Sequence, residues 1–263
     1  MVWASSQFSV RFNGGEAYEP GGYITDYYTD EALKVIEKNK NRPFFLYLGH
    51  FAPHNPLQAL KEDYDHFHHL SEKDDHRMRV YSAMIKSLDR SVGKILNALD
   101  QYNLSENTLI IFSSDNGGAD YIHLSDINKP YRGWKITHFE GGLHIPFMAK
   151  WPAEIEPGTI FEHPIHQNDI FTTFAAAAGA TIPNDRVIDG KNIVPFIKEN
   201  KPPHETLFWR SGRMQTILHN EWKMLVDKNQ KKKWLFNLSN DPTERKNLAS
   251  QMPDKVKLLE SLL

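Results

Sequence analysis

The sequence predicts an α/β fold, with a sheet sandwiched between helices, followed by a smaller C-terminal α+β module with an antiparallel sheet. Two apolar runs that are typical of buried strands, Phe44–Leu48 and Thr108–Phe112, flank a long stretch with helical periodicity. This alternation of strand and helix indicates a parallel sheet covered by helices. After Pro202 the strands become short and closely spaced, so we expect domains at residues 1–203 and 204–263.

The first half of the chain contains two predicted helices with one strand between them. Thr29 can cap a helix that runs to Asn39, because a threonine hydroxyl accepts a hydrogen bond from the first turn. The apolar run Phe44–Leu48 follows as a strand. The second helix is expected over about Arg77 to Tyr102, where apolar residues recur at helical spacing.

The second half begins with the predicted strand Thr108–Phe112 and continues with a short strand at Ile145–Ala149. A helix from Asn168 is expected to end at Gly179, since glycine is common at helix C-termini. The predicted C-terminal module consists of four antiparallel strands and a helix, at Leu207–Arg210, Arg213–His219, Glu221–Asp227, Lys233–Leu238 and Pro253–Leu263.

The bulk composition excludes several classes of protein. The 263 residues are 40% hydrophobic and carry a net charge of −2, which is typical of a folded protein without a nucleic-acid partner. The chain contains no cysteine, so disulfides and a cysteine nucleophile are excluded within it. No apolar run is long enough to span a membrane, and Met1–Ser6 does not resemble a signal peptide. The oligomeric state stays open.

The turn after the Thr108–Phe112 strand carries the first candidate site. Asp115 and Asn116 lie at the carboxyl end of this strand, where open α/β sheets bind ligands. A carboxylate beside an amide oxygen suits Ca²⁺ or Mg²⁺ rather than zinc. Gly117–Gly118 would let the backbone approach a ligand closely. Taken alone, the tetrapeptide favours a plain turn, since Asn-Gly is a common turn dipeptide.

Two further loops carry side chains that can bind an anion. His54 lies between prolines after the Phe44–Leu48 strand, where an imidazole can donate to an anion or protonate a leaving group. Arg132 and Lys135 supply the positive charge that a sulfate or phosphate ester requires. Taken alone, each loop favours a plainer interpretation, a surface histidine in the first and a basic surface loop in the second.

Together these motifs resemble those of the type I sulfatases in the alkaline-phosphatase superfamily. That family carries an Ala-Pro-His-x-Pro-Leu-Gln stretch, matched by Ala52–Gln58, and Ser-Asp-Asn-Gly-Gly, matched by Ser114–Gly118. Its Arg-Gly-x-Lys and Glu-Gly-Gly motifs are matched by Arg132–Lys135 and Glu140–Gly142, and Trp234–Leu238 is similar to its C-terminal signature. The order of the motifs is that of the family. The pattern is most similar to arylsulfatases of the N-acetylgalactosamine-4-sulfatase type.

This resemblance implies an alkaline-phosphatase-like sheet and a role for each candidate residue. Asp115 and Asn116 would bind a Ca²⁺ ion, or Mg²⁺, that neutralises the sulfate. Lys135 would contact a sulfate oxygen and the bridging oxygen. His54 would hydrogen-bond the sulfate or help to protonate the leaving alcohol, and Arg132 is a further substrate-binding candidate. The substrate would be a sulfated small molecule or saccharide, and the location periplasmic, extracellular or lysosomal.

The sequence departs from the family in two motifs. Family members carry a Cys-x-Pro-x-Arg or Ser-x-Pro-x-Arg segment whose first residue becomes the formylglycine nucleophile, and an Asp pair that completes the calcium site. Neither is recognised in this sequence, because the pair Asp74–Asp75 follows no apolar strand and is interpreted as surface charge. We therefore expect a C-terminal portion of a sulfatase that is inactive in isolation, because nucleophile and metal ligands would be lacking.

Two alternatives stay open. A phosphoesterase or phosphonate hydrolase of the same superfamily would hold two transition metals with additional Asp and His ligands. The Arg-Gly-Trp-Lys motif beside Asp115–Asn116 favours one hard cation and sulfate instead. A non-catalytic anion-binding module would use the recognition residues without chemistry, and the absence of cysteine and of an assigned Asp pair supports it.

Overall fold

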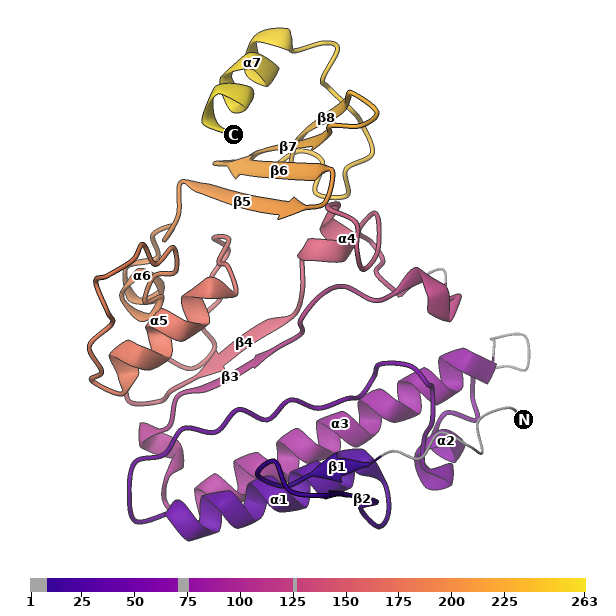
Figure 1. The fold of residues 1–263 in the computed structure, drawn as a ribbon, viewed down its shortest axis with the longest axis vertical. Helices are drawn as coiled ribbons and strands as arrows, with labels where there is room; N and C mark the ends of the chain where they lie inside the picture. Colours follow the sequence, from indigo (N-terminus) through magenta and orange to yellow (C-terminus); the bar gives the residue numbers. More distant parts are fainter. Residues whose placement is uncertain (1–8, 71–75, 125–126) are drawn as a thin grey trace. The chain divides into compact units, whose positions relative to one another are not determined.

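The computed structural model describes residues 9–70, 76–124 and 127–263, so Asp74–Asp75 and Met1–Ser6 lie outside the described residues. The chain forms two compact units, Met1–Glu106 and Asn107–Leu263, which we describe separately (Figure 1). The predicted domain boundary near residue 203 stays a prediction.

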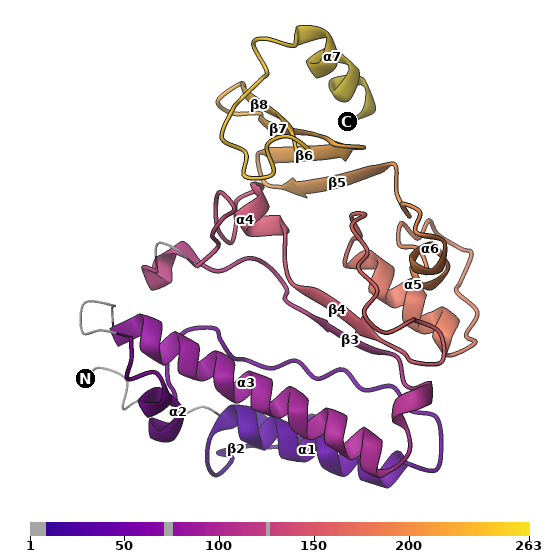
Figure 2. The same ribbon diagram turned by 180° about the vertical axis from the view of Figure 1, so that it is seen from behind.

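The first unit is built on two helices that pack side by side, α1 (Ile24–Asn39) and α3 (His76–Gln101) (Figures 1 and 2). The predicted second helix is confirmed to within one residue at each end. The predicted start of the first helix at Thr29 was wrong. Thr29 is buried inside α1, where its Oγ1 donates to Thr25 O and lies 2.6 Å from Ser91 Oγ of α3. The remaining elements are a hairpin, β1 (Val10–Arg11) and β2 (Ala17–Tyr18), and the short helix α2 (Lys61–His66).

The segment Phe44–Leu48 is extended but is not part of a sheet within the described part of its unit. Its prediction as a buried strand was wrong for the structure as described, because no strand among the described residues pairs with it. Phe45 and Tyr47 are 71% and 84% exposed, while the residues between and beside them are half-buried. Only one face of this extended segment is therefore covered in its own unit.

The second unit opens with β3 (Ile110–Ser113), which pairs antiparallel with β4 (Phe147–Lys150). Both strands were predicted, but the expected parallel arrangement was wrong for this pair. Helix α4 (Glu140–Leu143) lies in the connection between them, and α5 (Asn168–Ala177) ends just before Gly179, as predicted. The other short elements are η1 (Ser105–Asn107), η2 (Asp120–Ile122) and α6 (Val194–Glu199).

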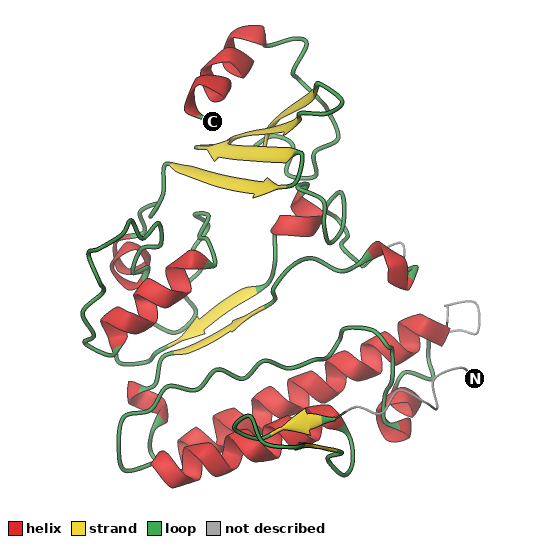
Figure 3. Cartoon of the chain, viewed as in Figure 1, coloured by secondary structure: helices red, strands yellow, loops and turns green. Residues whose placement is uncertain are grey.

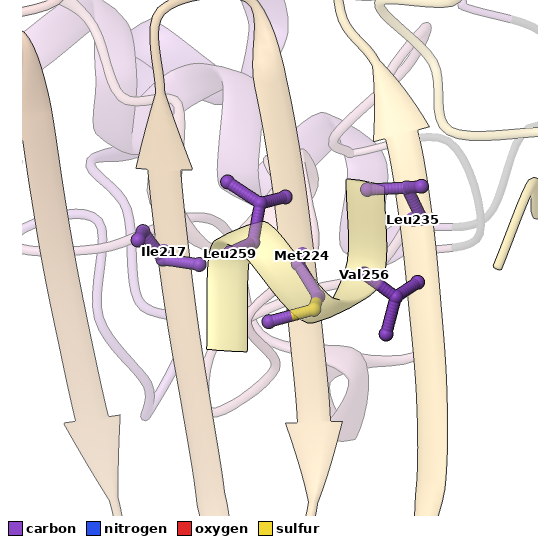
Figure 4. Packing of buried hydrophobic residues seen from close by; sticks show 5 residues of the cluster. All are labelled: Ile217, Met224, Leu235, Val256 and Leu259. Atoms are coloured by element: carbon purple, nitrogen blue, oxygen red, sulfur yellow. The ribbon is translucent and has the colours of Figure 1, made fainter. Parts of the chain in front are cut away.

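The C-terminal strands form the predicted antiparallel meander (Figure 3), consisting of β5 (Thr206–Ser211), β6 (Met214–His219), β7 (Trp222–Asp227) and β8 (Lys232–Asn237). Helix α7 (Pro253–Leu262) packs on one face of this sheet. There, Val256 and Leu259 bury apolar surface against Ile217, Met224 and Leu235 (Figure 4). Removing this surface from water is the main stabilising term of the packing.

Candidate active site

Backbone hydrogen bonds bring three of the sequence motifs together in the second unit. Gly117 N donates to Gly142 O at 3.1 Å, which joins the turn after β3 to helix α4. Lys135 N donates to Gly118 O at 3.0 Å, which joins the same turn to the Arg132–Lys135 loop. The Asp115–Gly118 turn, the Lys135 loop and the Glu-Gly-Gly motif therefore form one cluster.

Glycine is required in this cluster because the backbones touch. A Cβ atom on Gly117 would lie 1.8 Å from Gly141 O, and one on Gly142 would lie 2.2 Å from Thr137 O. Real Cβ contacts are never so short, so any side chain at these positions would push the loops apart. The glycines of the two motifs thus serve the contact between loops.

Two side chains that the sequence interpretation missed hold the turn after β3. Asn128 Oδ1 accepts from Gly118 N at 2.7 Å, and its Nδ2 donates to Gly118 O at 2.9 Å. Gln167 Nε2 donates to Ser114 O at 2.8 Å, from the residue that precedes α5. Asn128 and Gln167 fix the backbone that presents Asp115. No motif marked either residue, because such contacts depend on the fold.

Asp115 and Asn116 supply the kind of oxygen ligand that a hard cation binds, but two ligands are fewer than such a cation takes. Asp115 is exposed and Asn116 half-buried, and neither side chain forms a hydrogen bond or ion pair with a described residue. Their oxygens are the type that Ca²⁺ prefers, but Ca²⁺ takes about 6–8 oxygen ligands. No group of three or more acidic, histidine or cysteine side chains converges on one point among residues 9–70, 76–124 and 127–263.

Arg132 and Lys135 lie on the same loop but have different surroundings. Arg132 stacks over the Phe139 ring at 4.1 Å and its Nη1 donates to Glu244 O at 3.1 Å. These contacts attach the loop to the segment after β8. Lys135 is half-buried and follows Trp134, which is 44% exposed. The predicted roles of both cations stay predictions.

His54 belongs to the first unit, whereas the other candidates belong to the second. It is exposed in the loop between Ala52 and Pro56, its Nδ1 lies 2.8 Å from Asn55 O, and its ring lies 5.3 Å from that of Phe51. Its catalytic role also stays a prediction.

The glutamate of the Glu-Gly-Gly motif, Glu140, belongs to a buried ionic cluster. Lys223 of β7 is 1% exposed, and its Nζ lies 2.6 Å from Glu140 Oε1 and 3.0 Å from Glu244 Oε1. Glu140 N donates to Glu244 Oε2 at 2.6 Å. Glu244 Oε1 therefore shares the charge of Lys223 with Glu140. The cluster joins α4 to the C-terminal sheet.

The two carboxyl groups of this cluster differ in pKa. Burial alone raises the pKa of Glu140, but the hydrogen bond with His144 and the charge of Lys223 outweigh it and hold this pKa below its usual value. For Glu244, burial dominates and raises the pKa, because Lys223 and the Glu140 N–H offset only part of the desolvation.

His138 adds a second contact between this loop and the sheet. Its Nδ1 lies 2.8 Å from Thr216 Oγ1, and its Nε2 lies 2.6 Å from Ser211 Oγ. Burial, together with the charge of Lys223, lowers the pKa of His138 below 6.5. His138, with its two hydroxyl partners, is therefore part of the contact between this loop and the sheet.

The strand register explains how one sheet serves two purposes. Met224 pairs with Ile217 and lies on the face that α7 covers, whereas Lys223, its neighbour, points to the other face. Leu225 pairs with Thr216, so Thr216 and Lys223 share the face that contacts His138 and Glu140. A lysine in the middle of an apolar strand signals a buried acidic partner, because burying a charge without a partner is costly.

Comparison with known proteins supports the resemblance. The sequence matches the sulfatase family profile over residues 3–180, and the profile of the C-terminal part of N-sulphoglucosamine sulphohydrolase over residues 134–262. The chain belongs to the sulfatase family. Human steryl-sulfatase is 34% identical over 197 residues, covering 70% of this chain and 32% of the relative. Human N-acetylgalactosamine-6-sulfatase is 33% identical over 209 residues, covering 78% of this chain and 37% of the relative.

Solved sulfatase structures share the fold. The structure of Ps i-CgsB in complex with k-i-k-neocarrahexaose has a TM-score of 0.84 and 35% identity, covering 95% of this chain and 56% of that one. A phosphonate monoester hydrolase from Silicibacter pomeroyi is similar in fold alone, with a TM-score of 0.71 and 18% identity. This sulfatase chain therefore has the alkaline-phosphatase-like fold, and it spans about a third of its curated relatives and about half of its structural ones.

Sulfatase-family membership implies a metal ion and a formylglycine. No helix among the described residues of this sulfatase chain is long and apolar enough to cross a membrane. The likeness to the N-acetylgalactosamine-4-sulfatase type stays a prediction.

Proposed function

We propose that the whole protein hydrolyses sulfate esters, and that residues 107–263 supply part of its sulfate and metal site. The observation that carries this proposal is the cluster in which Lys135 N bonds to Gly118 O, two residues after Asn116. This backbone contact holds the loop that carries Lys135 beside the turn that carries Asp115 and Asn116. A sulfate ester needs both the cationic side chain and the hard oxygen donors, because negative charge develops on its oxygens during cleavage.

Each residue receives a role in this proposal. Asp115 and Asn116 would hold a Ca²⁺ ion, whose charge would neutralise the sulfate oxygens. Lys135 would donate to a sulfate oxygen and to the bridging oxygen. Arg132 would have a secondary role in substrate binding, and His54 would hydrogen-bond the sulfate or help to protonate the leaving alcohol.

We further propose a sulfated saccharide as substrate and a periplasmic, extracellular or lysosomal location. N-acetylgalactosamine-6-sulfatase is named for a sulfated sugar, and Ps i-CgsB was solved with a neocarrahexaose. N-acetylgalactosamine-6-sulfatase (33% identical) and Ps i-CgsB (35% identical) match 78% and 95% of this chain, whereas steryl-sulfatase (34% identical) matches 70%. We base the choice of saccharides over sterols on this wider match.

Hydrolysis assays of the full-length protein, including any residues that precede Met1, test the proposal. We expect release of sulfate from sulfated saccharides, with one Ca²⁺ per chain by metal analysis. Faster release of phosphate or phosphonate, with two transition-metal ions per chain, would contradict it and favour the phosphoesterase alternative.

Sequencing the gene upstream of the Met1 codon separates an enzyme from a non-catalytic binding module. We expect an in-frame segment with an Asp pair and a Cys-x-Pro-x-Arg or Ser-x-Pro-x-Arg motif. An in-frame stop codon immediately before Met1, with no such segment nearby, would support the binding module instead.

A further inference from the structure

Lys135 lies in a tight turn whose conformation is unusual for its sequence. Thr137 N donates to Trp134 O at 2.9 Å, which closes a β-turn with Lys135 and Ile136 at its centre. Ile136 has φ of 82°, and Lys135 is not among the residues with positive φ. These signs define a type II turn, whose third position favours glycine.

Isoleucine is among the least suitable residues for that position. A branched side chain at positive φ crowds the adjacent backbone, so Ile136 stores strain that glycine would relieve. The turn persists because Thr137 Oγ1 donates to Trp134 O at 2.7 Å and accepts from Trp134 N at 3.0 Å. The Lys135 N–H bond to Gly118 O holds it from the other side.

Packing within the unit does not compensate for this strain. Ile136 is 78% exposed, and its neighbour Trp134 is 44% exposed. An exposed isoleucine at a strained position costs stability twice, through the backbone and through apolar surface left in water. Strained residues that gain nothing from packing occur mainly where a ligand makes use of them.

We propose that Trp134 and Ile136 form an apolar pair beside Lys135 that packs against the ring of the sulfated saccharide. This inference rests on the proposed function. Sugar rings present C–H groups on their faces, and binding sites use aromatic and aliphatic side chains for such surfaces while a few polar groups fix the orientation. Ile136 would thus determine specificity for the ring, and Lys135 would bind the sulfate.

Binding measurements on the full-length protein test this inference, with sulfated N-acetylgalactosamine and inorganic sulfate as the two probes. Ile136→Gly and Ile136→Asn both tolerate positive φ, so the turn and the direction of Lys135 are kept. We expect either change to weaken binding of the sulfated sugar by roughly tenfold and to leave inorganic sulfate unchanged. Ile160→Gly, at an isoleucine that is 82% exposed elsewhere, is the matched control and should change neither.

Three outcomes would overturn the inference. Unchanged binding of both probes would show that the side chain does not touch the sugar. An equal loss for both would assign Ile136 to the positioning of Lys135. A melting temperature of Ile136→Asn well below that of the wild type would show that Ile136 is covered by protein, because relief of backbone strain at an exposed position offsets the small entropy that asparagine adds to the unfolded chain. Sulfate release by the wild type, measured separately, decides the proposed function itself.

Discussion

Lys223 Nζ lies 2.6 Å from Glu140 Oε1, so a buried lysine of the C-terminal sheet is paired with the glutamate of the Glu-Gly-Gly motif. The next residue, Gly141, donates its N–H to Arg132 O at 2.6 Å, and Gly142 O accepts from Gly117 N. The ion pair is thus connected through backbone hydrogen bonds to both loops of the candidate site. The C-terminal sheet therefore supports the loops of the candidate site.

Replacing Lys223 by methionine should strongly destabilise the second unit. The change leaves Glu140 and Glu244 buried without their cation, and breaking a buried pair typically costs about 3–5 kcal/mol. The free energy of unfolding in urea measures this loss. Lys228→Met, at an exposed lysine just after the same strand, should change stability by less than about 0.5 kcal/mol. Equal effects of the two changes would refute the structural importance of the pair.

His138 should make stability decrease in mild acid. Its pKa is lowered in the folded state, so the unfolded chain binds more protons as pH falls below 6.5. The contribution of neutral His138 is present above that pH and is lost as pH falls toward the folded pKa. Melting temperatures between pH 8 and pH 5, as a rough range around the usual histidine pKa, measure this slope.

The variant His138→Gln should show a shallower acid slope than the wild type, because glutamine does not titrate. A residual slope is expected from His50 and His166, since burial also lowers the pKa of each. His69→Gln, at an exposed histidine, is the control and should keep the wild-type slope. The account of His138 fails if His138→Gln also keeps the wild-type slope.

Asn128→Ala should loosen the turn that presents Asp115. The change removes the acceptor of Gly118 N and the donor to Gly133 O, and each unsatisfied group in a partly buried loop costs about 1–3 kcal/mol. Gly118 O loses one of its two donors and keeps Lys135 N. Calorimetric titration of the full-length protein with Ca²⁺ should then show weaker binding, together with a lower melting temperature. Asn184→Ala, in an exposed loop, should leave both unchanged. An unaltered Ca²⁺ affinity in Asn128→Ala would separate this turn from the metal site.

Two glycine-to-alanine changes should have opposite signs. Gly117→Ala places a Cβ 1.8 Å from Gly141 O and should destabilise the second unit by more than about 2 kcal/mol, since backbone cannot move aside cheaply. Gly93→Ala lies inside α3 with open space at its Cβ, and should stabilise the protein by roughly 0.5–1 kcal/mol. Thermal melts distinguish the two, and a neutral Gly117→Ala would contradict the close packing of the loops.

The elements with strong local signals could be predicted from the sequence. Helix α3 and the four-stranded meander follow from periodicity and turn residues, and both are confirmed. The predicted start of α1 was wrong because a threonine such as Thr29 can hydrogen-bond to a carbonyl inside a helix as well as cap one. The prediction of a buried strand at Phe44–Leu48 was wrong because such a strand requires a neighbouring strand, and local sequence does not show whether one is present.

Sequence reasoning named only the motif residues of the candidate site, and their roles stay predictions. Asp115 and Lys135 are marked by chemistry and order along the chain, whereas Asn128 and Gln167 act through contacts that only the fold creates. Ile136, which we propose to contact the saccharide, gave no signal in the sequence, since its unusual feature is a backbone angle. Such residues support or border a site without belonging to its motifs.

Steady-state sulfate release by the full-length protein tests the central claim most directly, with Asp115→Ala and Lys135→Ala compared to the wild type. The account predicts that each variant folds with a near-native melting temperature and loses at least about a hundredfold in kcat/KM. Lys150→Ala, at an exposed lysine of β4, should keep the wild-type rate. Asp115→Ala or Lys135→Ala with wild-type kcat/KM would contradict the assignment of this cluster as the sulfate and metal site.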